Sequence, residues 1–218
     1  MGSCCSTFCT TTERQFNGAV ARRDLKRYRR RGPDATTRLL RDTILRAGAV
    51  GSVLDVGTGI GALSFELLAA GVPKATAVDA ASAYLAVARE EAGRRNLADR
   101  LELLHGDFVA LAPQLAPTDV VAMNRVVCCY PAYEPLLEKA LDRSRRFFAF
   151  SYPQDRWYVR TVVSLMNFAR AMFRNPFRVF VHSAAGMHAL LARGGFSAVS
   201  RRTTPVWAVE LYARTQTG

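Results

Sequence analysis

A glycine-rich turn constrains this chain more than any other feature. Residues 52–56 form a short apolar run, Gly57, Gly59 and Gly61 follow it at every second position, and residues 60–70 carry leucines at helical spacing. Glycine tolerates positive φ and lets a ligand approach the backbone closely. The free N–H groups at the start of a helix attract a negative group. The segment therefore predicts a strand, a ligand-binding turn and a helix.

Apolar runs of strand length alternate with helical patterns along the rest of the chain, which implies βαβ units and a parallel sheet. The strand runs cover 74–78, 101–104, 119–123 and 146–151. The helical patterns cover 34–47, 82–95, 135–142, 155–174 and 183–193. Two final strands, 196–202 and 206–213, are joined by a short link, so we expect an antiparallel hairpin. With 218 residues and no long linker, the chain is expected to form one domain.

Two segments fall outside this alternation, and we expect both to roof a pocket at the carboxyl ends of the strands. Residues 1–33 form a basic cap segment, which we expect to be helical. Residues 153–182 form an inserted lid after the fifth strand, with Asp155 as a helix cap. Within the core, Ser82 is expected to cap the helix over 82–95. The pairs Glu90–Arg94 and Glu91–Arg95 are expected on the exposed side of that helix.

Acidic residues at strand ends restrict the class of ligand that the turn can bind. The glycines are spaced G-x-G-x-G, whereas a nicotinamide-binding turn has G-x-G-x-x-G. Asp55 stands two residues before the first glycine, and Asp79 ends the second predicted strand. A carboxylate at a strand's carboxyl end can accept both hydroxyls of a ribose. The alternative for Asp79 is a helix cap or loop acid.

The third and fourth strands are also followed by polar residues. Asp107, in the segment HGDF, is a candidate acceptor for an adenine amino group, with Phe108 beside the ring; the alternative is a turn aspartate. Asn124 and Arg125 follow the fourth strand, where we expect backbone contact with the ligand.

At these residues the chain resembles the class I S-adenosylmethionine (SAM)-dependent methyltransferases, over about 36–214. The resemblance implies an α/β, Rossmann-like, seven-stranded, mostly parallel sheet with the last strand antiparallel and helices on both faces. It implies SAM as cofactor and no metal. The element order is similar to magnesium-protoporphyrin O-methyltransferase, but the segment VVCCYP is not typical of that enzyme, so its substrate does not carry over. The implied cofactor-binding residues are Asp55, Gly57, Thr58, Gly59, Gly61, Asp79, Ala80, Gly106, Asp107, Phe108, Asn124 and Arg125.

The expected partner is a small-molecule methyl acceptor. Methyl transfer from SAM needs mainly alignment in a dry pocket, and a general base only if the acceptor must lose a proton. His182, just before the last predicted helix, is the candidate base; the alternative is a structural histidine. Candidate acceptor-binding residues, which could instead pack the lid on the core, are Tyr28, Arg31, Tyr130, Tyr133, Tyr152 and Trp157.

The formal net charge of +12, from 30 Lys and Arg against 18 Asp and Glu, attracts anions, whether small acidic molecules or nucleic acid. A nucleic-acid methyltransferase is thus an alternative, although the segment NRVV replaces the N/D-P-P-Y motif of base methyltransferases. A non-catalytic SAM-binding module is another alternative.

The five cysteines form a poor disulfide framework, which favours a reducing cytoplasm. No apolar run is long enough to span a membrane. The N-terminal MGSCCS matches a myristoylation pattern, with a frayed terminus as the alternative. A metal site at Cys4, Cys5 and Cys9 lacks the accompanying ligands.

Overall fold

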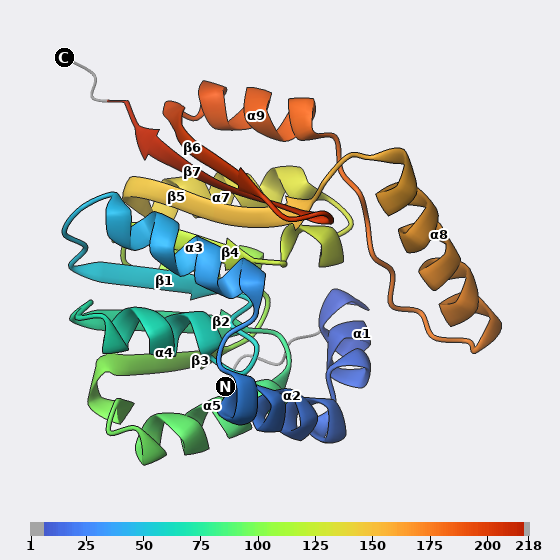
Figure 1. Ribbon diagram of the computed structural model, residues 1–218, viewed down its shortest axis with the longest axis horizontal. Helices are drawn as coiled ribbons and strands as arrows, with labels where there is room; N and C mark the ends of the chain where they lie inside the picture. The colour runs from blue at the N-terminus through green and yellow to red at the C-terminus, as the bar shows by residue number, and fades with distance from the viewer. Residues whose placement is uncertain (1–6, 216–218) are drawn as a thin grey trace.

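Seven strands form one mixed sheet in the order β3-β2-β1-β4-β5-β7-β6 (Figure 1). The computed structural model describes residues 7–215. Strands β1 to β5 pair in parallel, whereas β7 runs antiparallel to both β5 and β6. The predicted Rossmann-like sheet with an antiparallel finish is confirmed. The strands are β1 (Ser52–Val56), β2 (Lys74–Asp79), β3 (Leu101–His105), β4 (Thr118–Asn124), β5 (Ser144–Pro153), β6 (Phe196–Thr203) and β7 (Trp207–Arg214).

Helices cover both faces of this sheet because successive strand side chains point to opposite sides. In β1, Leu54 and Val56 pack with one helix layer and Val53 packs with the other. The layer beside Leu54 contains α6 (Phe108–Leu111), α7 (Tyr133–Arg143) and α9 (Ala184–Arg193). The opposite layer contains α2 (Gly18–Arg31), α3 (Ala35–Arg46), α4 (Ala62–Ala69) and α5 (Ser82–Arg94).

The N-terminal segment folds onto the sheet through α1 (Thr7–Gln15) and α2. Asn17 caps α2 by accepting hydrogen bonds from two backbone N–H groups of its first turn. Ala21, Leu25 and Tyr28 of α2 are buried against α4 and α5. Glu13 of α1 accepts hydrogen bonds from the backbone N–H and hydroxyl of Ser82. The basic segment is therefore an amphipathic cap.

Two expectations about α5 are wrong. Ser82 is the first helical residue, and the N-cap position belongs to Ala81, whose methyl side chain cannot form a capping hydrogen bond. Glu91 is fully buried and not exposed, because Arg29 of α2 bonds its carboxylate together with Arg94 and Arg95. The packing of α2 over this position turned an expected surface pair into a buried ion cluster.

Helix α8 (Trp157–Met172) projects from the rest of the fold in Figure 1. Val159 is its one buried residue. Asp155 does not cap α8: Arg156 occupies the N-cap position, and Asp155 forms an ion pair with Arg160. Within residues 7–215, no helix is long and apolar enough to cross a membrane.

The described cysteines are in two oxidation states. Cys9 is disulfide-bonded, which the cysteine pattern did not predict. Cys128 and Cys129 carry free thiols. Cys4, Cys5 and the N-terminal myristoylation pattern lie outside the described residues.

Candidate functional site

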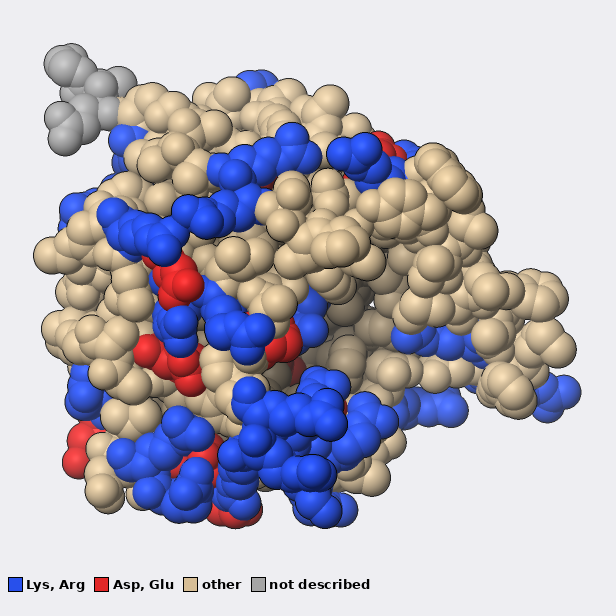
Figure 2. Space-filling model, in the orientation of Figure 1, with Lys and Arg blue, Asp and Glu red and all other residues tan. Residues whose placement is uncertain are grey.

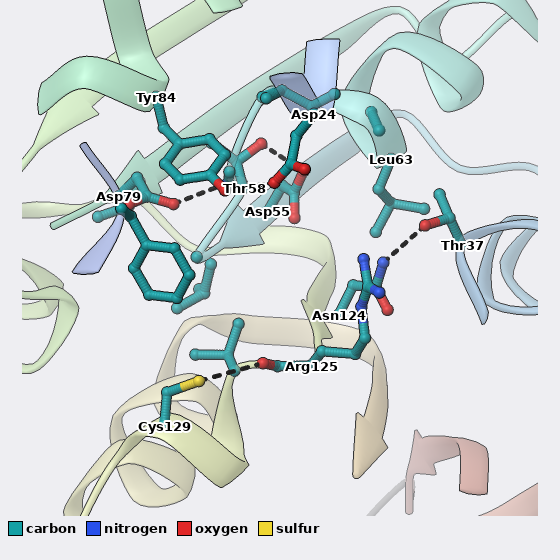
Figure 3. A pocket seen from close by; sticks show the side chains of 18 of the residues that line it. Asp24, Thr37, Asp55, Thr58, Leu63, Asp79, Tyr84, Asn124, Arg125 and Cys129 are labelled. Carbon is teal, nitrogen blue, oxygen red and sulfur yellow. Dashed lines mark hydrogen bonds between the residues drawn. The ribbon is translucent and has the colours of Figure 1, made fainter. Parts of the chain in front are cut away.

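A cavity of about 610 Å³, here called the main cavity, opens at the carboxyl ends of β1, β2 and β4 (Figure 3). Ligands bind at this edge in open α/β sheets, where the strand order reverses, and here the reversal falls between β1 and β4. The N-terminal segment contributes another wall through Phe8 of α1, Phe16 of the link that follows α1, and Asp24 of α2.

The glycine turn after β1 forms the floor of the main cavity. Gly57, Gly59 and Gly61 have φ values of 66°, 57° and 83°, a region that strains residues with a Cβ atom. A Cβ on Gly57 would lie 2.4 Å from Val126 Cγ2. Gly59 leaves its backbone open to the cavity, beside Tyr84. Gly61 is not among the residues that line the main cavity, and a Cβ there would lie 2.8 Å from Phe65 Cζ, so close packing also favours glycine at this position.

Asp79 ends β2 and lies beside the turn. Its Oδ2 accepts a hydrogen bond from Gly59 N at 2.7 Å, and its Oδ1 accepts one from Ala81 N at 2.8 Å. Burial raises the pKa of this carboxyl to about 6, although both backbone bonds act in the opposite direction. Each carboxylate oxygen can accept a further hydrogen bond. Asp79 thus both anchors the turn and offers a doubly accepting group to a ligand.

Asp55 lies beneath the same turn. Its Oδ2 accepts hydrogen bonds of 2.7 Å from the hydroxyls of Thr58 and Ser64. Its Oδ1 is buried and has no hydrogen-bond partner among the described residues. Burial raises the pKa of the Asp55 carboxyl above its ordinary value. A buried acceptor without a partner is costly, so this atom fits a ligand that donates a hydrogen bond.

The ends of β3 and β4 supply the remaining wall. Asp107 accepts hydrogen bonds from Val109 N and from the Tyr130 hydroxyl, each at 3.0 Å, while Phe108 is buried beside it. Asn124 donates to the Thr37 hydroxyl at 2.8 Å. These side chains line the main cavity with Ala80 and Gly106, although their own bonds hold neighbouring elements together.

Arg125 follows β4 with φ 62°, a strained conformation for a residue other than glycine. Its N–H donates to the Ser151 hydroxyl at 2.8 Å, and its guanidinium pairs with Asp34 at 2.8 Å. The backbone carbonyl of Arg125 accepts from the thiols of Cys128 and Cys129. The segment after β4 is thereby fixed against β5, α3 and its own following turn.

Of the six proposed acceptor residues, Tyr28, Arg31 and Tyr130 line the main cavity. Tyr28 is only 5% exposed, and its hydroxyl donates to Glu66 at 2.8 Å, so it packs α2 on α4. The hydroxyl of Tyr130 donates its hydrogen bond to the Asp107 carboxylate. Arg31 is exposed at the mouth.

Three proposed acceptor residues and the proposed base lie away from the main cavity. Tyr152 is buried in the core, where its hydroxyl donates to Glu210 at 2.7 Å. Trp157 is 79% exposed on α8. Tyr133 packs against His182 with the two rings tilted by 56°. His182 Nε2 lies 3.1 Å from Val127 O and 3.0 Å from Tyr130 O, so it braces the turn after β4.

Sequence reasoning missed Tyr84 and Asp24, whose 2.6 Å hydrogen bond joins α5 to α2 across the main cavity. It also missed Phe16, which packs edge-on against Tyr84 and Phe177. The spacing of Ala21, Leu25 and Tyr28 could have shown that this basic segment has an apolar face.

A second cavity of about 420 Å³, here called the α8 cavity, shares Phe16, Arg125 and Cys129 with the main cavity. Most of its wall is apolar. The other lining residues are Gln15, Cys128, Pro153, Tyr158, Val159, Val162, Val163, Met166, Arg170, Phe177, Val179, Val206 and Trp207.

Comparison with known proteins shows a likeness to methyltransferases over part of the chain. Residues 53–149 match a family model described as a methyltransferase domain. The chain is 35% identical to a release factor glutamine methyltransferase of Caulobacter vibrioides over 104 residues, which cover 41% of this chain and 36% of that enzyme. The chain thus spans about a third of that relative's length.

Solved structures show the same fold. A magnesium protoporphyrin IX methyltransferase from Synechocystis PCC 6803, with bound SAH, has a TM-score of 0.73 and 18% identity, covering 95% of this chain and 100% of that one. An O-methyltransferase family protein from Burkholderia thailandensis has a TM-score of 0.69 and 14% identity, covering 84% and 56%. At these identities the likeness establishes a shared fold.

Proposed function

We propose that the chain is a class I, SAM-dependent methyltransferase and that it transfers the methyl group of SAM to a small-molecule acceptor. The observation that carries the proposal is the pairing of the glycine turn with the Asp79 carboxylate at the carboxyl edge of the sheet. The likeness in fold to a methyltransferase that acts on magnesium protoporphyrin IX supports a small acceptor.

The main cavity fits SAM by the chemistry of its walls. Asp79 would accept the two ribose hydroxyls, because both of its oxygens keep a free lone pair beside the Gly59 backbone. Asp55 Oδ1 would accept a hydrogen bond from the ammonium group of the methionyl part, since it has no other partner among the described residues. The residues proposed to hold SAM are Asp55, Gly57, Thr58, Gly59, Asp79, Ala80, Gly106, Asp107, Phe108, Asn124 and Arg125.

SAM supplies an activated sulfonium methyl group when it is bound. The chain's own contribution is to hold the acceptor in line with that group and to exclude water. The fixed backbone of Arg125 and the wall formed by Phe16, in the link between α1 and α2, would serve this purpose. His182 is held by two backbone carbonyls outside the main cavity, which argues against its acting as the base.

The test is methyl transfer itself. Purified protein is incubated with SAM labelled in its methyl group and with fractionated small metabolites, and S-adenosylhomocysteine (SAH) formation is measured. Acceptor-dependent SAH formation supports the proposal. Tight SAM binding with no turnover across all fractions would favour the non-catalytic binding module.

A nucleic-acid acceptor is the second candidate, favoured by the basic cluster of α2, which lies below a hollow in the surface in Figure 2. Its exposed residues are Arg22, Arg23, Lys26, Arg27, Arg29, Arg30 and Arg31. RNA affinity that falls steeply with salt would support this candidate. Absence of RNA binding at low salt would exclude it.

We also propose a cytoplasmic location, which rests on the free thiols of Cys128 and Cys129. The disulfide at Cys9 is the opposing observation, because disulfides are rare in a reducing cytoplasm.

A further inference from the structure

The α8 cavity adjoins the main cavity at the segment that follows β4. The two cavities share Phe16, Arg125 and Cys129, so a molecule in the α8 cavity lies next to the proposed cofactor site. Its volume of about 420 Å³ is large enough for a small organic molecule, since ligand pockets span roughly 300–1,000 Å³. The position is that of a second substrate.

The walls of the α8 cavity are suited to an apolar molecule. Helix α8 contributes Val159, Val162, Val163 and Met166 on one side. Residues from the β5 end, the chain after α8 and the β6–β7 hairpin form the other side. Burial of apolar area against such walls is favourable by about 25 cal/mol per Å². The acceptor body is therefore expected to be hydrocarbon or aromatic.

Two arginines are the charged residues in this wall, and its described lining contains no acid. Arg125 is already neutralised by its ion pair with Asp34. Arg170 has no carboxylate partner among residues 7–215, and its Nη1 atom is buried without a hydrogen-bond partner. Its guanidinium lies over the ring of Phe177, with Cζ 5.4 Å from the ring centroid.

A buried guanidinium without an acceptor is costly, because arginine stays charged in proteins. A carboxylate or similar anion would accept hydrogen bonds from this guanidinium and neutralise its charge, since two oxygens match the paired guanidinium donors. The positive charge of Arg170 also reaches Cys129, where it favours the thiolate and contributes to a lowered pKa, although the bond from Cys128 is the larger cause. Arg170 thus places a positive charge in the wall of the α8 cavity, close enough to act on Cys129, which both cavities share.

We propose that the α8 cavity binds the methyl acceptor, and that this acceptor is an apolar molecule bearing one anionic group that pairs with Arg170. The acceptor role rests on the proposed function, whereas the selection of an apolar anion rests on the cavity alone.

The experiment uses 2-naphthoate as the apolar anion and 2-naphthalenemethanol as its uncharged counterpart. Both are titrated by calorimetry into the full chain, with and without SAH, at a salt concentration that screens surface charge. Arg170→Gln is compared with Arg174→Gln, which removes one positive charge from an exposed position just beyond α8. Arg170→Lys keeps the charge, and melting curves confirm that each variant folds.

We expect naphthoate to bind the native protein at least tenfold more tightly than the alcohol. Arg170→Gln should weaken naphthoate at least tenfold, Arg174→Gln should change it less than twofold, and SAH affinity should stay the same in both. Val163→Trp, which fills the α8 cavity, should abolish naphthoate binding. Equal binding of the two probes, or naphthoate binding unaffected by Arg170→Gln or Val163→Trp, would overturn the proposal.

The two proposals fail separately. If the native protein binds no SAH, the proposed function is wrong, but the naphthoate comparison without SAH still decides what the α8 cavity selects. If SAH binds and naphthoate does not, the cofactor assignment survives and the anion site is refuted.

Discussion

Replacing Asp79 with alanine tests the cofactor assignment most directly. The change removes the proposed acceptor of two ribose hydroxyls and leaves Gly59 N and Ala81 N without their partner. A hydrogen bond to a charged group contributes about 1.5–3 kcal/mol. Two such bonds sum to about 3–6 kcal/mol, so SAH affinity at pH 8 should fall at least roughly a hundredfold.

The same change has opposing effects on stability. A carboxyl group with a folded-state pKa near 6 and an unfolded value near 3.8 is harder to ionise in the folded protein. The contribution of this group to the free energy of unfolding is fully present below pH 4, and it declines by about 3 kcal/mol in total as the pH rises through 6. Removing Asp79 relieves this cost at pH 8 but loses two backbone bonds, so we expect a small net shift in the melting temperature.

The assay is calorimetric titration of SAH at pH 8. The matched control is Asp99→Ala, which removes an exposed acid from the short helix η1 (Ala98–Arg100), away from the main cavity. The control should bind SAH as the native protein does. If Asp79→Ala also binds SAH within twofold of the native protein while remaining folded, the ribose assignment is refuted.

Three further predictions follow from the same geometry. SAH affinity should fall as pH drops below about 6, because protonated Asp79 loses acceptor capacity; a flat binding profile from pH 5 to 8 would contradict this. Gly57→Ala should destabilise the fold by about 1–3 kcal/mol in urea unfolding, since its Cβ would strike Val126, whereas Gly93→Ala has open space and should be neutral or stabilising. Glu91→Gln should lower the free energy of unfolding by about 2 kcal/mol at pH 7. The arginine partners of Glu91 lower its pKa to about 2, so the stability that the carboxylate contributes is present above pH 4.5 and is lost as the pH falls toward 2. At pH 2 the variant and the native protein should therefore unfold alike.

Local patterns predicted the sheet well because they depend on neighbouring residues. The apolar run of β1 and the acid at the end of β2 follow directly from chain order, and a parallel sheet brings their carboxyl ends to one edge. Gly61 shows the limit of this reasoning. Its pattern is the same as that of Gly57, but only the packed structure reveals that a Cβ at Gly61 would strike Phe65.

The errors arose where distant segments meet. Tyr152 was a reasonable cavity residue by its place at the end of β5, yet Glu210 of β7 draws its hydroxyl into the core. Glu91 has the spacing of a surface pair and is buried because α2 brings Arg29 over it. Such contacts depend on tertiary packing, which neither periodicity nor residue type encodes.

The scarcity of buried residues in α8 has a consequence for exchange with solvent. Helix α7 buries four residues, whereas α8 buries one. Local opening free energy follows buried contact, so the amide hydrogens of α8 should exchange with deuterium far sooner than those of α7. Because α8 forms one wall of the α8 cavity, its separation from the fold would give a bulky molecule a route inward. The rate of that separation would then set an upper bound on turnover.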